Sequence, residues 1–152
     1  MNNVDSLLWA ETDGACAHCG LKDQRVLSVH HIHPQEPKDE SYDNKLLLCH
    51  NCHHLHHQGK GASKEDLLAI KERLIRKTLT QHGVNAIKTS RRSGFVVAAP
   101  YLVNHLMELG LLHQKEVIST VRTDDPQAEV VAEAIYELTL AGAKFAEKWK
   151  LD

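Results

Sequence analysis

The sequence predicts an α+β protein in which a small module of two strands and a short helix precedes a mainly helical C-terminal region. The cysteines and most of the histidines are confined to the first 62 residues, where short β-branched or apolar runs alternate with turn-forming segments. The later residues instead place apolar side chains at helical spacing. We therefore divide the 152-residue chain into a module over residues 1–62 and a helical region over residues 63–152.

The elements of the first module are predicted in the order strand, loop, strand, helix. Residues 25–32 read R-V-L-S-V-H-H-I, an alternating and β-branched run that predicts a strand ending at a histidine pair. Residues 34–44 are polar and rich in turn formers, which indicates a loop, and residues 45–48 form a short apolar run typical of a second strand. Residues 51–58 contain no helix breaker before Gly59, so we expect a short helix closed by that glycine.

The C-terminal region is predicted to contain helices over residues 63–83, 100–109, 114–121 and 124–149. The first begins with a capping pattern at Ser63 and Asp66, and a basic, poorly periodic connector follows it. Pro100 favours the first turn of the next helix. The last is expected to be long and amphipathic, because its apolar residues fall on one helical face: Val130, Ala134, Ile135, Leu138, Ala141, Phe145 and Trp149.

Length and hydropathy limit the class of protein. With 42% hydrophobic residues, the chain can bury one core but not two large domains. The longest apolar stretch, residues 95–112, is interrupted by polar and charged side chains and therefore fails as a membrane span. Residues 1–9 contain Asp5 and no basic residue ahead of an apolar run, which is wrong for an export signal. We expect a cytoplasmic protein with no membrane partner.

Charge is unevenly distributed along the chain, although the net charge is only −2. Residues 1–92 contain 13 Lys and Arg against 11 Asp and Glu, whereas residues 93–152 contain 5 against 9. Basic residues are densest over residues 71–92. If DNA is the partner, this stretch is expected to contact its backbone, but a solvated helix face with a basic loop explains the pattern equally well. The candidate backbone contacts are Arg73, Arg76, Arg91 and Arg92.

Four cysteines form two C-x-x-C pairs, Cys16/Cys19 and Cys49/Cys52, separated by 29 residues. Each C-x-x-C turn presents two sulfurs, and two such turns complete the tetrahedral thiolate site that zinc prefers. In a reducing compartment this pairing favours a metal over disulfides. The alternatives are a redox pair or buried thiols without partners. The sequence therefore predicts a structural Zn²⁺ site, with a further element inserted between its halves.

The residues between and after the cysteine pairs form an ordered set of histidines around an asparagine. They read H-H-I-H-P at residues 30–34, D-N at 43–44, and C-H-N-C-H-H-L-H-H at 49–57. Over residues 14–58 this arrangement resembles the HNH endonuclease family, whose ββα-metal finger is bracketed in some members by two C-x-x-C pairs. The resemblance implies a metal-dependent nuclease that hydrolyses DNA phosphodiester bonds, with double-stranded DNA as the expected partner.

By similarity to the family, His31 is the general base that activates water, His30 and His53 bind a catalytic Mg²⁺, Mn²⁺ or Ni²⁺ ion, and His57 binds the metal or the phosphate. His53 and His57 are spaced i, i+4, which places both imidazoles on one helix face. Asn44 matches the asparagine that ties the loop together and helps to orient the base, although in some members that position reaches the metal. Because adjacent strand residues face opposite sides, the sequence also predicts a distortion or the onset of a loop near His30.

Several alternatives stay open at this point. His50 with His54, or His53 with His56, would supply a competing metal face on the same helix. The protein is expected to be an HNH endonuclease. The same scaffold also suits a catalytically weak or inactive zinc-finger protein with a DNA-binding or regulatory role. A third alternative is a structural subunit. The C-terminal region either contacts DNA or mediates assembly. Its last helix packs on its own module or pairs with a second subunit in a homodimer.

Overall fold

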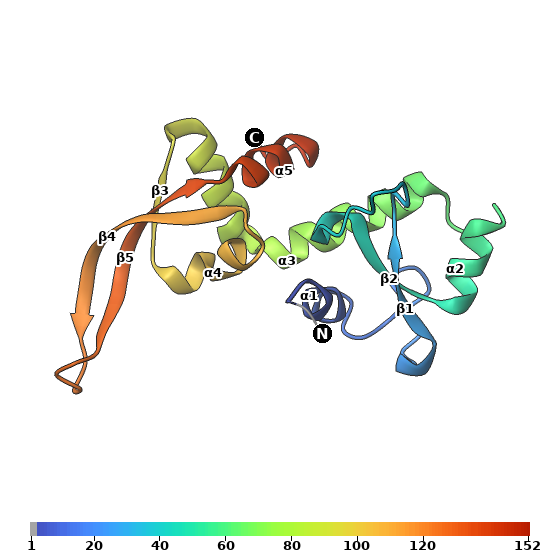
Figure 1. Cartoon of the computed structure of the whole chain (residues 1–152), viewed down its shortest axis with the longest axis horizontal. Helices are drawn as coiled ribbons and strands as arrows, with labels where there is room; N and C mark the ends of the chain where they lie inside the picture. The colour runs from blue at the N-terminus through green and yellow to red at the C-terminus, as the bar shows by residue number, and fades with distance from the viewer. Residues whose placement is uncertain (1–2) are drawn as a thin grey trace. The chain divides into compact units, whose positions relative to one another are not determined.

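The computed structural model describes residues 3–152, and these form two compact units, the first ending at Thr78 and the second beginning at Leu79. Helix α3 (Lys64–Ser93) contributes to both units and is interrupted at Thr80, whose φ of 61° and ψ of 170° are not helical (Figure 1). Each unit is described separately below. The described helices include none that is both long enough and apolar enough to cross a membrane.

The first unit is built on a two-stranded antiparallel sheet, with a helix leaving its second strand (Figure 1). The sequence-predicted order of strand, loop, strand and helix is confirmed, whereas α1 was not predicted. Gly59 follows the helix α2 with φ of +67°, as expected for a closing glycine. The elements of this unit before α3 are α1 (Asn3–Glu11), the short 3-10 helix η1 (Gln24–Val26), β1 (Leu27–His31), the 3-10 helix η2 (Tyr42–Asn44), β2 (Lys45–Cys49) and α2 (His50–His57).

The pairing of β1 with β2 is continuous, from Leu27 opposite Cys49 to His31 opposite Lys45. The strand is therefore not distorted at His30, and the loop that was the alternative expectation begins after His31, the last residue of β1. A regular strand directs neighbouring side chains to opposite faces, so His30 and His31 lie on different sides of the sheet. His30 is 3% exposed. The histidine pair thus separates into a buried member and a half-buried member.

Strand β2 is buried along its whole length, and Leu46, Leu47 and Leu48 are completely inaccessible to solvent. Such burial on both faces requires cover from both sides of the sheet. Leu67 and Ile70 of α3 belong to the same apolar cluster. The predicted module boundary at residue 62 falls in the turn before α3, and the first part of this helix is integral to the core of the first unit.

A buried polar network links α1, η2 and α3. Lys71 and Glu11 form an ion pair, and the Lys71 ammonium also lies 3.6 Å from the centre of the Tyr42 ring. The Tyr42 hydroxyl donates to the second oxygen of Glu11 and lies 3.0 Å from the Thr78 hydroxyl. Burial raises the pKa of Glu11 and lowers that of Lys71 to about 8, in each case against the attraction of the partner charge. The network fixes η2, which precedes β2.

The second unit contains a three-stranded antiparallel sheet in the order β3-β5-β4. Its two long strands form a ribbon whose turn lies away from the helices of the unit (Figure 1). Gly142 allows close packing after the sheet, because a Cβ atom at this position would lie 2.0 Å from the Leu111 carbonyl oxygen. The elements after α3 are β3 (Val96–Ala98), α4 (Pro100–Glu108), β4 (Leu112–Arg122), β5 (Glu129–Leu138) and α5 (Leu140–Lys148).

The prediction of a mainly helical region over residues 63–152 is wrong for its later part. The helix predicted from Pro100 is confirmed, but residues 114–121 lie in β4, and the predicted helix over residues 124–149 is β5 followed by α5. Residues 115–121 read K-E-V-I-S-T-V, and their β-branched side chains favour a strand. The connector after Gly83 is also helical, as far as Ser93.

Candidate functional site

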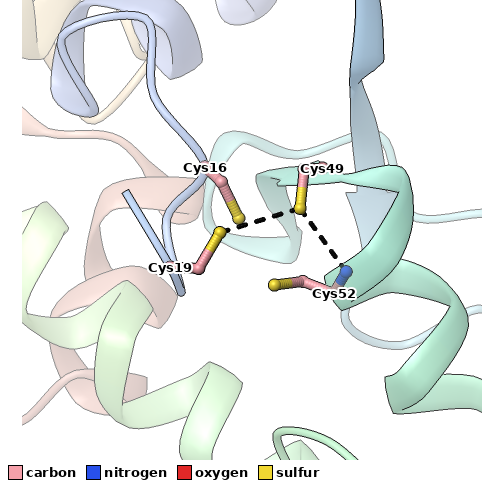
Figure 2. A group of neighbouring side chains, drawn as sticks. All are labelled: Cys16, Cys19, Cys49 and Cys52. Carbon is pink, nitrogen blue, oxygen red and sulfur yellow. Dashed lines mark hydrogen bonds between the residues drawn. The ribbon is translucent and has the colours of Figure 1, made fainter. Parts of the chain in front are cut away.

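The four cysteines of the first unit converge on one point (Figure 2). Their sulfur atoms all lie within 4.8 Å of one another. Cys16 and Cys19 come from the loop after α1, which is tied to β2 by a hydrogen bond from the Ala17 amide to the Leu47 carbonyl oxygen, 2.8 Å. Cys49 caps the N-terminus of α2, and its sulfur lies 3.5 Å from the amide nitrogen of Cys52.

The cysteine cluster has the dimensions of a zinc site. Sulfurs about 2.3 Å from a tetrahedral zinc ion are about 3.8 Å apart. The Cys19 and Cys49 sulfurs are separated by 3.7 Å. Gly20 closes the first turn with φ of +76°, the left-handed conformation that its lack of a side chain permits. The cluster is therefore suited to a structural metal such as zinc.

The surroundings of the sulfurs also suit a cation. Burial opposes ionisation of Cys16, but backbone amides from Cys19, Cys49 and His18 outweigh this effect and lower its pKa to about 7. Burial and the neighbouring sulfurs raise the pKa of Cys52, since thiolates repel one another. The Nδ1 atom of His18 lies 3.5 Å from the Cys52 sulfur. A bound divalent ion would remove the repulsion and hold the thiolates.

A second cluster joins β1 to α2. His30, His53 and His57 each offer one ring nitrogen, and these atoms lie within 4.8 Å of one another. The i, i+4 spacing places His53 and His57 on one face of α2, with ring centres 4.8 Å apart. The ring centre of His30 is 4.7 Å from that of His53. Burial decreases across the set, from buried His30 through half-buried His53 to exposed His57.

The environment of His30 fits a metal ligand. Its Nε2 atom is buried and has no hydrogen-bond partner among residues 3–152. Burial, followed by the charges of His53, His56, His57 and His31, lowers the pKa of His30 to about 4. The ring is therefore neutral near pH 7, the state in which imidazole binds metals. A buried ring nitrogen without a partner, on an imidazole that neighbours two further imidazoles, is an arrangement that a divalent ion would satisfy.

His31 lies beside an acidic side chain that the sequence did not single out. Its Nε2 atom is 2.9 Å from Oε1 of Glu40. The other carboxylate oxygen of Glu40 contacts the Lys45 ammonium, and Lys45 also lies 3.9 Å from Asp5. Lys45, followed by His31, holds the pKa of the Glu40 carboxyl below its usual range. Glu40 is therefore an ionised acceptor shared by His31 and Lys45.

Asn44 is fully buried and ties the intervening loop to the strands. Its side-chain oxygen accepts from the His33 amide at 2.9 Å, and its side-chain nitrogen donates to the carbonyl oxygens of His33 at 3.2 Å and Asp39 at 2.8 Å. The Asn44 backbone oxygen accepts from the Ile32 amide at 2.8 Å. These contacts account for an asparagine here, since a side-chain amide combines an acceptor oxygen with a nitrogen that has two hydrogens to donate.

The other helix histidines have separate surroundings. Nδ1 of His56 lies 2.6 Å from the Ala62 carbonyl oxygen, a contact between α2 and the turn before α3. His50 and His54 are exposed, and with Asn51, His53 and His57 they line an open pocket on α2. This pocket leaves His53 and His57 accessible from solvent. Among the described residues, the two competing histidine faces do not form a converging group of three or more candidate ligands.

The candidate DNA contacts are distributed over both units. Arg73 and Arg76 are exposed in the first unit, and Arg76 lies 3.5 Å from Glu72. Arg91 and Arg92 are exposed in the second unit, where Arg91 pairs with Asp152 at 2.8 Å. Lys71, counted in the same basic stretch, is completely buried and belongs to the core. The arginines therefore remain available at the surface, whereas Lys71 does not.

Two polar contacts of the first unit are not marked by any local sequence pattern. Glu40 lies in a loop that also contains Glu36, Asp39 and Asp43, so position along the chain does not distinguish it. The Lys71–Glu11 pair joins residues 60 positions apart, and no local pattern marks it. Comparison of the chain with models of known protein families, with curated proteins and with solved structures finds no match.

Proposed function

We propose that the first unit is a ββα-metal finger of the HNH type and that the protein is a metal-dependent endonuclease acting on DNA. The observation that carries this proposal is the histidine cluster, in which His30 contributes a buried and unpartnered ring nitrogen beside His53 and His57. The cysteine cluster a few residues away supports the same proposal, because a small module of this kind needs an additional stabilising element such as structural zinc.

Hydrolysis of a phosphodiester requires an activated water and stabilisation of the charge that develops on the phosphate and leaving oxygens. A divalent ion such as Mg²⁺, Mn²⁺ or Ni²⁺, bound by His30, His53 and His57, would supply that charge stabilisation. His31 takes the proton from water while the water oxygen bonds to phosphorus. The bond between phosphorus and the leaving oxygen breaks, and that oxygen takes a proton from solvent. Asn44 keeps the loop between the strands in place.

The second candidate function is a catalytically weak or inactive DNA-binding or regulatory protein on the same scaffold. One observation favours it: His30 and His31 lie on opposite faces of β1. Water held by His31 must therefore reach phosphate bound on the metal side around the end of the strand.

A cleavage assay on supercoiled plasmid distinguishes the two functions. The zinc-loaded protein is incubated with plasmid and Mg²⁺, Mn²⁺ or Ni²⁺, with and without a chelator, and zinc content is measured after each reaction. The nuclease converts plasmid to nicked or linear DNA, and chelation stops the conversion while the cysteine-bound zinc is retained. A DNA-binding scaffold retards the plasmid in a gel and leaves it supercoiled with every metal. That second result would reject the proposed nuclease.

A further inference from the structure

The acidic residue beside the proposed base has a defined geometry. Glu40 Oε1 lies 2.9 Å from Nε2 of His31, and the His31 side chain is only 20% exposed. A carboxylate accepts hydrogen bonds and donates none, so the contact requires the proton of neutral His31 to be on Nε2. The other ring nitrogen, Nδ1, then carries the lone pair. The contact therefore selects one of the two tautomers of the imidazole.

Glu40 is itself held from the opposite side. Its second carboxylate oxygen contacts the ammonium of Lys45, whose side chain is 4% exposed. Lys45 lies directly opposite His31 in the β1–β2 register, so both side chains project from the same face of the sheet. A carboxylate that is 60% exposed would ordinarily be free to rotate. Here a buried cation fixes one oxygen and leaves the other facing the histidine.

The backbone next to Glu40 is anchored as well. The Asn44 side chain donates to the carbonyl oxygen of Asp39 at 2.8 Å, and Asp39 accepts from the Ser41 amide at 2.9 Å. Asn44 is fully buried at the end of η2, directly before β2. Asn44 thus holds the backbone of Asp39, and the next residue, Glu40, contacts the ring of His31.

We infer that Glu40 is a positioning residue for His31, holding the ring proton on Nε2 so that Nδ1 is the atom that takes the proton from water. This inference rests on the proposed nuclease function. Glu40 does not itself take the proton; after transfer, its negative charge faces the imidazolium that has formed. In this arrangement water is the nucleophile, His31 is the base and Glu40 is the third group that orients the base. Lys45 and Asn44 act one step further away, by keeping Glu40 in place.

Glu40→Gln tests the inference, with Glu36→Gln as the matched control. Glu36 lies in the same loop and its carboxylate pairs with Lys38 at 4.0 Å. Long-range proton–nitrogen NMR of histidine-labelled protein, without added divalent metal or DNA at pH 8, reports which ring nitrogen carries the proton. The His31 signal is assigned by its loss in His31→Ala. Plasmid cleavage gives kcat and KM for each variant.

We expect the parent and Glu36→Gln to show the Nε2-protonated ring, and Glu40→Gln to show a mixture, because an amide both donates and accepts. In Glu40→Gln, kcat should fall about 10- to 100-fold, a typical cost of losing an outer partner, with KM unchanged. Glu40→Asp, which keeps the carboxylate, should recover part of the rate. An unchanged tautomer, or a Glu40→Gln rate equal to that of Glu36→Gln, overturns the inference. A parent that cleaves no plasmid overturns the nuclease function instead, and the NMR comparison still decides whether Glu40 sets the tautomer.

Discussion

The ammonium of Lys71 lies 2.8 Å from the carboxylate of Glu11, and both side chains are fully excluded from solvent. Removing one partner of such a pair leaves a buried group without compensation. We expect Lys71→Met to lower the free energy of unfolding of the first unit by about 3 kcal/mol or more. The double variant Glu11→Met/Lys71→Met should recover most of that loss in urea denaturation. Equal stability of parent and Lys71→Met would show that the pair contributes nothing.

The same pair predicts a pH dependence. Burial lowers the pKa of folded Lys71 to about 8, below the value of about 10.4 for an unfolded lysine. Between these values the unfolded chain binds more protons, so this group's contribution to stability increases as pH rises from 8 to 10 and is lost as pH falls through 8. The urea midpoint of the parent, measured relative to Lys71→Met, should therefore rise over this range. A difference that stays constant with pH would contradict the assigned shift.

Loss of one cysteine should abolish both metal binding and the folding of the first unit. We expect the parent to hold one zinc per chain, because the four sulfurs have the spacing of a tetrahedral site. Cys49→Ser removes a ligand that also caps α2. The variant should contain no zinc by elemental analysis, and the cooperative thermal transition of the first unit should disappear. Retention of one zinc with the parental transition would refute the site.

His31→Ala and His53→Ala should affect plasmid cleavage differently. His31→Ala should lower the rate by about 10² to 10⁴ while zinc, fold and DNA binding persist, because a general base acts only on water. His53→Ala removes a proposed metal ligand, so a higher Mn²⁺ concentration should restore part of its rate but none of that of His31→Ala. His54→Ala, exposed on the same helix, is the control. Parental cleavage by His31→Ala, or a greater loss in His54→Ala than in His53→Ala, would refute these assignments.

The surface arginines should contribute affinity for DNA without sequence choice. We expect Arg73→Gln/Arg76→Gln and Arg91→Gln/Arg92→Gln to weaken binding equally for unrelated duplexes and to reduce its salt dependence, since each lost phosphate contact lowers the slope by about 0.9. The charge-matched control is Lys144→Gln/Lys150→Gln, two exposed lysines in and just after α5, outside the basic stretch. Arginine variants with the affinity and salt slope of the control would assign the basic stretch to ordinary solvated surface.

The first unit could be predicted from local patterns because its determinants lie close together in sequence. The alternation of residues 25–32 predicted β1, and the two C-x-x-C pairs predicted the converging sulfurs. Spacing alone placed His53 and His57 together. Glu40 could not be assigned, because its partners Lys45 and His31 meet it only after β1 and β2 pair.

The strand β5 of the second unit was predicted as a helix because the spacing of its apolar residues is ambiguous. Val130, Ala134 and Leu138 recur every four residues, a spacing that fits one face of a helix and also one face of a strand. The residues between them decide the matter, because Ala132 and Tyr136 make every second position from Val130 to Leu138 apolar, which is the strand period of two. The glutamates of this segment all fall on the other set of positions, at Glu129, Glu133 and Glu137. Pairing with β3 and β4 then stabilises β5, and this long-range contact leaves no local signature.

The contribution of α3 to the first unit determines which fragment of the chain would fold alone. A fragment ending at residue 62 would lack Leu67 and Ile70 from the apolar cluster and would leave Glu11 buried without Lys71. A fragment ending at Thr78 keeps these residues and also the hydroxyl that meets Tyr42. The shortest autonomous form of the metal-binding half is therefore expected to end close to Thr78, and shorter pieces should be recovered as insoluble or proteolysed material.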